Sequence, residues 1–140
     1  MWPRTRFLFI YHYSFKQACM PKRNYKRGIV AVVAQIKKII DANPANGKST
    51  ATLATEHGIS RNALQEVFKE KYHQPIGQYK LQLRMEEARQ LLKAGKSIKE
   101  VAFILNYASP SSFSNAFSNF YNISASEWLQ DGGYNANKQG

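Results

Sequence analysis

Apolar and polar residues repeat with a helical period along most of this chain, most clearly from Ser97 to Tyr121. Glu100 follows Ser97 at the spacing of a capping box, in which each side chain bonds the other residue's backbone N–H. Ser109 and Pro110 predict a second helix start, because serine favours the N-cap and proline costs no hydrogen bond at the first helical position. The pattern therefore predicts two short helices with a tight break between them.

The second of these helices has two contrasting faces. Its inner face carries apolar residues at positions i, i+3, i+4 and i+7, namely Phe113, Ala116, Phe117 and Phe120. Its outer face is small and polar, with Ser111, Ser112, Asn115, Ser118 and Asn119. Asn106 precedes it, and asparagine tolerates the left-handed backbone that ends a helix and turns the chain. The stretch is typical of a helix-turn-helix unit, although any packed hairpin of two helices would fit it equally well.

A second copy of the same pattern lies earlier in the chain and favours the helix-turn-helix interpretation. Leu53-Ala54 and Gly58 match Val101-Ala102 and Asn106 at an offset of 48 residues. After the turn the offset becomes 49 residues, and the matched positions are Ser60, Leu64, Phe68 and Tyr72 with Ser109, Phe113, Phe117 and Tyr121. The chain thus contains the unit twice.

The remaining helical patterns complete an all-α fold. Residues 29–42 form an amphipathic helix whose apolar face is widened by Val32 and Ile39, and Ser49 caps a short helix before Gly58. A longer helix over about 75–94 carries a buried stripe and directs Arg84 to water or to the flanks of the domain; the stripe comprises Leu81, Met85, Ala88 and Leu92. At ~1.5 Å per residue this helix spans ~30 Å, close to one turn of DNA. A closing helix with Trp128 follows a second capping box.

Charge is concentrated at the N-terminus. The chain has a formal net charge of +11, and residues 1–28 hold seven of its 20 basic residues and no acidic ones. The remainder has 13 basic and nine acidic residues, a net of +4, so nucleic-acid binding depends on the motif more than on charge. Residues 1–28 are interpreted as a poorly ordered tail that touches phosphates; a signal peptide, a remnant of a longer protein or a misplaced start are alternatives. Residues 131–140 are expected to form a flexible tail.

Enzymatic and metal chemistry have little support. The three histidines (His12, His57 and His73) lack ligand spacing, and neither a phosphate-binding glycine loop nor a nucleophile motif occurs. The single cysteine, Cys19, rules out an internal disulfide framework and fits a reducing cytoplasm. No apolar run approaches the ~18 residues that a membrane span needs. We therefore expect no catalytic residues, metal, cofactor, membrane insertion or small-molecule site.

These motifs resemble the DNA-binding domain of the AraC/XylS family of bacterial transcription regulators. The likeness covers residues 29–130 and rests on both repeats and on the helix between them. Beyond the repeat positions it includes Ile59, Lys69, Pro75, Tyr79, Arg84, Met85, Ala88, Leu91, Leu92, Ser97, Ile98, Tyr107, Pro110, Ser111, Ser114 and Trp128. The resemblance implies a seven-helix domain in which two helix-turn-helix units, about 49–72 and 97–121, are joined by a linker helix, about 75–94. It also implies a cytoplasmic transcriptional regulator whose partners are double-stranded DNA and RNA polymerase.

By motif position, the resemblance assigns DNA contacts to the outer faces of two recognition helices, which read successive major grooves. The candidate residues are Arg61, Asn62, Gln65, Glu66 and Lys69 in the first unit and Ser111, Ser112 and Asn115 in the second. The chain departs from the family where Asn106 and Asn122 replace glycine and where Asn115 stands in place of a frequent arginine. No positive charge occurs between Pro110 and Tyr121.

Two alternatives remain open from the sequence. The chain could be a helical protein-interaction module, or a truncated regulator that binds DNA weakly and lacks its own effector domain, because only 28 residues precede the first helix. Salt-dependent retention on duplex DNA would distinguish DNA binding from protein interaction, since phosphate contacts release counterions.

Overall fold

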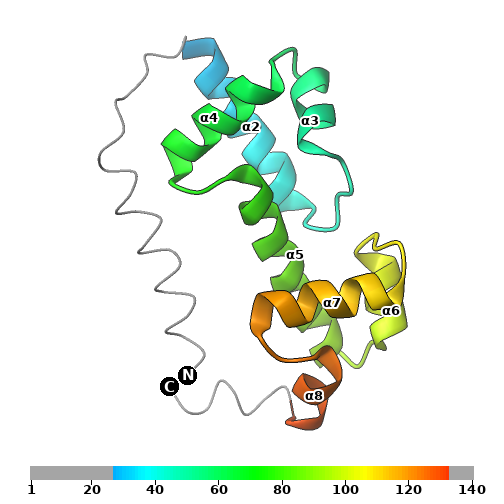
Figure 1. Ribbon diagram of the computed structural model, residues 1–140. Helices are drawn as coiled ribbons and strands as arrows, with labels where there is room; N and C mark the ends of the chain where they lie inside the picture. The colour runs from blue at the N-terminus through cyan, green and yellow to red at the C-terminus, as the bar shows by residue number, and fades with distance from the viewer. Residues whose placement is uncertain (1–26, 133–140) are drawn as a thin grey trace. The chain divides into compact units, whose positions relative to one another are not determined.

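The computed structural model of this protein describes residues 27–132, and this part of the chain contains helices and no strands. The seven helices are α2 (Arg27–Ala42), α3 (Thr50–Glu56), α4 (Arg61–Tyr72), α5 (Ile76–Lys93), α6 (Ile98–Ile104), α7 (Pro110–Tyr121) and α8 (Ala125–Gln130) (Figure 1). The predicted all-α class is confirmed.

The described residues form two compact units. Unit 1 comprises residues 27–42 and 48–80, and unit 2 comprises Asn43–Gly47 together with residues 81–132. Each unit holds one of the two repeats. Helix α5 passes from unit 1 into unit 2 without a break, and the α2–α3 loop belongs to unit 2 although both helices that flank it belong to unit 1.

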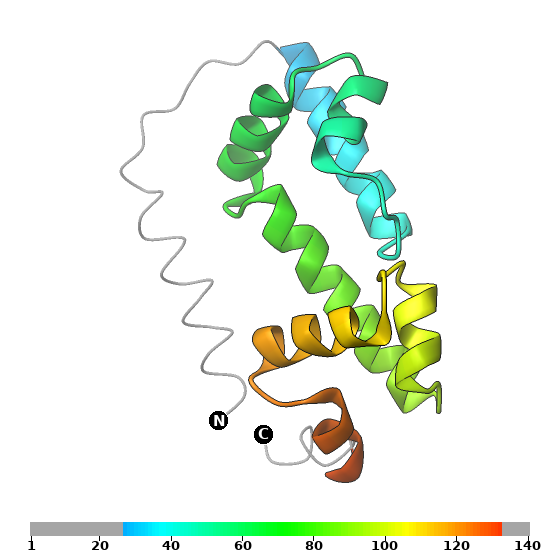
Figure 2. The same ribbon diagram turned by 45° about the vertical axis from the view of Figure 1, so that its right-hand side comes forward.

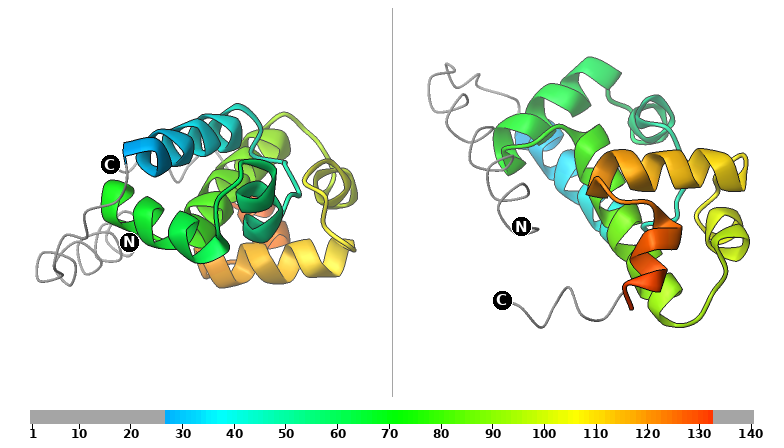
Figure 3. Two further views of the ribbon diagram at one scale, coloured as in Figure 1. Left: turned by 90° about the horizontal axis from the view of Figure 1, so that it is seen from above. Right: turned by 60° about the horizontal axis from the view of Figure 1, so that its bottom comes forward.

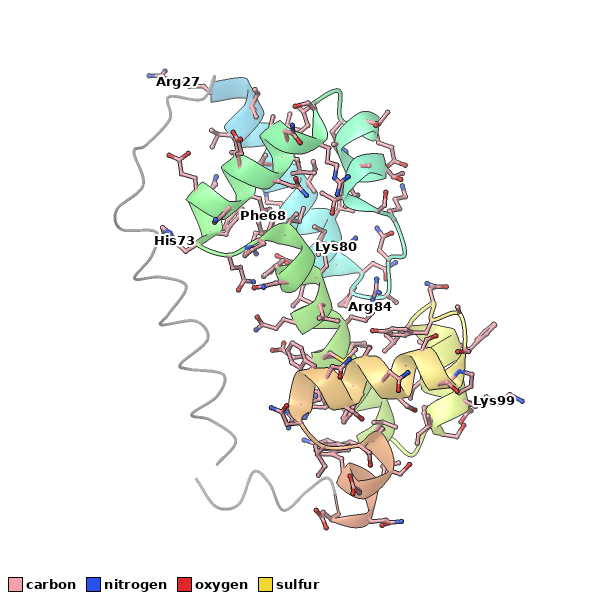
Figure 4. The ribbon with its side chains drawn as sticks, in the orientation of Figure 1. Arg27, Phe68, His73, Lys80, Arg84 and Lys99 are labelled. Carbon is pink, nitrogen blue, oxygen red and sulfur yellow. The ribbon has the colours of Figure 1, made fainter. Side chains whose placement is uncertain are left out.

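Unit 1 is built around helix α4, which packs against both α2 and α3 (Figure 3). Its core consists of side chains that are at most 2% exposed: Val33, Ile36, Ile40, Leu53, Ala54, Leu64, Val67, Phe68 and Ile76. Phe68 points inward from α4 (Figure 4), and its ring centroid lies 5.5 Å from that of Tyr79 at the start of α5. This aromatic contact joins the recognition helix of the first repeat to the linker helix.

Unit 2 has an aromatic core. Helix α7 packs against α6 and crosses the second half of α5 (Figure 2), and the buried stripe of α5 is Met85, Ala88 and Leu92. Phe117 is fully buried, with ring centroids 5.8 Å from Phe113 and 6.0 Å from Trp128. Burial of large aromatic rings is the main source of stability in such a small unit.

Serine side chains start five of the helices, as the sequence predicts. Ser49, Ser60, Ser97, Ser109 and Ser124 each accept a hydrogen bond from a backbone N–H in the first turn. Both predicted capping boxes are present, and in each the carboxylate of Glu100 or Glu127 accepts the N–H of its serine. Hydrogen bonds from Ser97 and Ser124 lower the pKa of these two carboxyl groups.

Two expectations from helical periodicity were wrong, and a third was right in only one of its alternatives. Ile39 does not widen the buried face of α2, because its side chain remains 38% exposed. Leu81 does not belong to the buried stripe of α5 and is 36% exposed; it lies where the helix leaves unit 1 and enters unit 2. Of the two expected surroundings of Arg84, water and the flanks of the domain, open water is the one that the structure rules out. Arg84 is half-buried, and its guanidinium carbon lies 5.5 Å from the centroid of the Tyr107 ring.

Candidate nucleic-acid interface

The outer face of α4 presents the candidate side chains of the first repeat. Arg61, Asn62, Gln65 and Glu66 are exposed, while Lys69 is half-buried at the end of the same face. They recur at i, i+1, i+4, i+5 and i+8, so they form one continuous strip opposite buried Leu64, Val67 and Phe68. Guanidinium and amide groups are the side chains that hydrogen-bond base edges in the major groove.

The outer face of α7 is uncharged. Ser111, Ser112 and Asn115 are all exposed and lie opposite the buried rings of Phe113 and Phe117. The hydroxyl of Ser112 is 2.9 Å from the N-cap hydroxyl of Ser109, so it is shared with the cap. Asn115 is therefore the group on this face best suited to bidentate recognition of a base.

The two turns have the backbone that the sequence predicts. Gly58 and Asn106 have φ of 68° and 58°, the left-handed conformation that glycine adopts freely and asparagine at modest cost. The recognition helices also end alike, since His73 and Asn122 have φ of 58° and 57°. The expectation that Asn106 can take the place of a turn glycine is confirmed.

Asn106 has a second role, which sequence reasoning missed. Its side-chain amide donates a 2.8 Å hydrogen bond to the carbonyl oxygen of Ala45, and Arg84 donates to the carbonyl oxygen of Asn46 at 3.4 Å. Both acceptors lie in the Asn43–Gly47 loop. The partners are 61 and 38 residues apart, so no local pattern in the sequence points to either bond.

The positive charges beside the two recognition helices differ. Helix α4 carries Arg61, Lys69 and Lys71. In unit 2, exposed Lys99 lies on α6, and Lys96 just before α6 is 3.8 Å from Glu100, whereas Arg84 and Arg89 of α5 are half-buried against aromatic rings. Lys48, which precedes α3, forms a 2.8 Å ion pair with Glu56. The outer face of α4 therefore carries charged and amide groups, and the outer face of α7 carries neutral ones.

Histidines and acidic residues form no alternative site in residues 27–132. No group of three or more His, Cys, Asp or Glu residues that could hold a metal ion occurs in this part of the chain. His57 and His73 terminate α3 and α4, as expected for helix-end residues. None of the helices described is long and apolar enough to cross a bilayer. Cys19, His12 and the predicted phosphate contacts of the basic tail, apart from Arg27, lie outside the described residues.

Several known proteins that this chain resembles are transcription regulators. A helix-turn-helix domain family matches residues 53–131, which include both repeats. The Msm operon regulatory protein of Streptococcus mutans is 30% identical over 102 residues, which cover 72% of this chain and 37% of that protein. The transcriptional activator AarP of Providencia stuartii is 29% identical over 107 residues, covering 75% of this chain and 79% of AarP.

A solved structure supports the same relationship. The AraC-type transcriptional regulator from Chromobacterium violaceum superposes with a TM-score of 0.59 at 30% identity, covering 73% of this chain and 92% of that chain. This chain therefore corresponds to nearly all of that structure but to little more than a third of the Streptococcus protein.

Proposed function

Because this chain belongs to the AraC-type family of helix-turn-helix domains, we propose that it is a sequence-specific DNA-binding transcriptional regulator. Its outer α4 and α7 faces read two successive major grooves of a promoter site. It acts in the cytoplasm, where bacterial DNA is accessible. The relatives and the family are regulators, so the chain is not an enzyme.

One observation carries this proposal: two recognition helices repeat the same architecture, each with a serine cap, a buried apolar face and an exposed polar face. Folding requires only the buried face. The exposed strips are rich in amides and hydroxyls, which hydrogen-bond bases and phosphates. The first strip supplies charge and base-reading amides. The second supplies Asn115, which suits adenine.

Replacing Gln65 or Asn62 with alanine tests direct base reading by α4. Each change should cost about 1–3 kcal/mol at the specific site and relax the preference for the contacted base. Selection of bound sequences from random DNA defines the site, and titration of matched and mismatched duplexes measures the loss. Gln78→Ala, an exposed glutamine on α5 of the same unit, is the control and should bind normally. Equal losses on specific and random DNA would argue against direct reading by α4.

Deleting residues 1–26 tests whether the basic tail contacts phosphates. The deletion removes six of the seven cations that precede residue 29. Affinity should fall by a similar factor on all sequences, and each lost phosphate contact should reduce the slope of log affinity against log salt by about 0.9. Binding measured between low and physiological salt gives this slope. A slope that does not change would mean that the tail leaves DNA untouched.

RNA polymerase is proposed as the protein partner, and Phe103 is the side chain that favours a protein contact. Phe103 is 83% exposed on α6, whereas the matched residue of the first repeat is the small polar Thr55, so folding does not require an apolar ring there. Lys99 lies one turn earlier and extends away from α7 (Figure 4). Apolar and aromatic side chains of this kind anchor protein interfaces.

Phe103→Thr should weaken binding to purified RNA polymerase holoenzyme at least tenfold, on the order of a hot-spot effect, without changing affinity for the DNA site. Fluorescence anisotropy of the labelled protein measures the first quantity, and duplex titration measures the second. Leu129→Thr, at a 39% exposed position of the same unit, is the matched control. Equal polymerase binding by both variants would exclude Phe103 as the contact.

A further inference from the structure

Each recognition helix ends in a tyrosine followed by a residue with left-handed backbone. In unit 1 these are Tyr72 and His73, and in unit 2 they are Tyr121 and Asn122. The N–H of His73 bonds the carbonyl oxygen of Lys69 at 2.9 Å, and that of Asn122 bonds Ser118 at 2.8 Å. The last turn of both helices is thus closed in the same way.

In unit 1, a lysine lies between this tyrosine and a second aromatic ring. The Nζ of Lys37 on α2 is 5.5 Å from the centroid of the Tyr72 ring and 5.1 Å from that of the Tyr79 ring on α5. One carboxylate oxygen of Asp41 lies 2.6 Å from the Lys37 Nζ, and the other accepts a hydrogen bond from the hydroxyl of Tyr79. The hydrogen bond with Asp41, and next that with Tyr79, raise the pKa of Lys37 above its usual value. Lys37 is therefore a cation throughout the physiological range.

In unit 2, an arginine has the same relation to two rings. The guanidinium carbon of Arg89 on α5 lies 5.6 Å from the centroid of the Tyr121 ring and 5.7 Å from that of the Trp128 ring on α8. Tyr121 is 6% exposed and Trp128 2% exposed, so the cation lies against rings that are almost completely buried. A cation within about 6 Å of a ring centroid is attracted by the quadrupole of the ring.

The rings repeat in sequence, and the cations do not repeat at the same spacing. Tyr72 and Tyr121 are 49 residues apart, and so are Tyr79 and Trp128. Lys37 and Arg89 are 52 residues apart, four more than the offset of 48 that relates the helices before the turns. Four residues are about one helical turn, so both cations can lie on the same face of the helix that precedes their repeat.

We propose that Lys37 and Arg89 are positioning residues for DNA reading. Each cation, held between two aromatic rings, fixes the C-terminal end of its recognition helix and so the angle at which that helix enters the groove. The serine cap and the buried face hold the rest of the helix, and the cation links its last residue to a neighbouring helix. This inference rests on the proposed function for its consequence at DNA, but the restraint on the helix end exists without DNA.

The first test follows the helix ends in the free protein. Lys37→Met and Arg89→Met keep an unbranched apolar side chain and remove the charge. Hydrogen exchange of residues 69–73 should become roughly tenfold faster in Lys37→Met, and that of residues 118–122 in Arg89→Met, each without effect on the other helix. Lys38→Met and Lys93→Met, at exposed positions of the same two helices, are matched controls. Unchanged exchange at both helix ends would overturn the proposal, whatever the protein binds.

The second test uses DNA and separates positioning from stability. Lys37→Met should reduce discrimination only against base changes in the half-site read by α4, and Arg89→Met only in the half-site read by α7, each about tenfold. Arg89→Lys keeps the charge and should restore most of this discrimination. A uniform loss on specific and random duplexes, in step with a lower melting temperature, would assign a purely structural role and overturn the proposal. If the wild-type protein binds all duplexes equally well, the proposed function fails. The hydrogen-exchange experiment then still decides whether Lys37 and Arg89 restrain the helix ends.

Discussion

Replacing Phe117 with alanine is expected to unfold unit 2 and to leave unit 1 folded. The Phe117 side chain is fully buried and touches the rings of Phe113, Tyr121 and Trp128, at centroid distances of 5.8, 4.7 and 6.0 Å. Removing a buried phenyl ring costs about 3–5 kcal/mol through lost transfer energy and the cavity left behind. That is a large share of the stability of a unit this small.

Trp128 makes this prediction measurable, because it is 2% exposed in unit 2 and the only other tryptophan of the chain is Trp2. In a Trp2→Phe background, the fluorescence of Trp128 reports unit 2, while circular dichroism reports the helices of both units. Phe103→Ala makes the same chemical change at an 83% exposed position and should shift the transition little. Loss of all helical signal in a single transition with Phe117→Ala would mean that unit 1 cannot stand alone.

Inserting one alanine after Lys80 is expected to abolish specific DNA binding while both units remain helical. The insertion point lies where α5 leaves unit 1 and enters unit 2, next to Leu81, which is 36% exposed. One extra residue in a helix rotates all later residues of that helix by about 100° relative to the earlier ones. If α5 sets the register between two reading helices, only one can then meet its groove at a time. The buried stripe from Met85 onward is left in phase with itself, so unit 2 keeps its core.

A footprint and circular dichroism of the insertion variant provide the test. We expect weak, salt-sensitive binding without a protected site, and helical content equal to that of the wild-type protein. Leu81→Ala, which changes the same point without changing the register, should give a normal footprint. A full-length footprint at wild-type affinity for the insertion variant would show that one unit alone reads the site, a result compatible with the absence of charge on α7.

Local features of the sequence accounted for the helices and for the side of each recognition helix that faces outward. Capping residues and apolar spacing act over three or four positions, and for this reason Ser97, Ser109 and Ser124 marked helix starts correctly. The same periodicity correctly placed Gln65 and Asn115 on exposed faces. Which of these side chains contacts a base stays a prediction, because exposure alone does not distinguish reading from solvation.

Two of the differences from expectation, at Leu81 and Arg84, occur where a helix leaves one unit for another or passes a distant loop. Leu81 continued the apolar spacing of α5, but it lies where the helix changes units and is partly exposed. Arg84 lies among the polar positions of α5. Its guanidinium nevertheless donates to a carbonyl oxygen of the Asn43–Gly47 loop and lies beside the ring of Tyr107. A helical period identifies which residues share a face, and the neighbour of that face is decided by the rest of the chain.

The sequence by itself therefore determined that this protein is a pair of capped, repeated helix-turn-helix units with polar outer faces, because caps, turns and amphipathic spacing are short-range properties of the chain. Only the tertiary structure decided that Asn106 binds the carbonyl of Ala45, that Lys37 lies between Tyr72 and Tyr79, and that Arg89 lies between Tyr121 and Trp128. Each of these contacts joins segments that are far apart in sequence, and their energies depend on distances that exist only after the helices have packed.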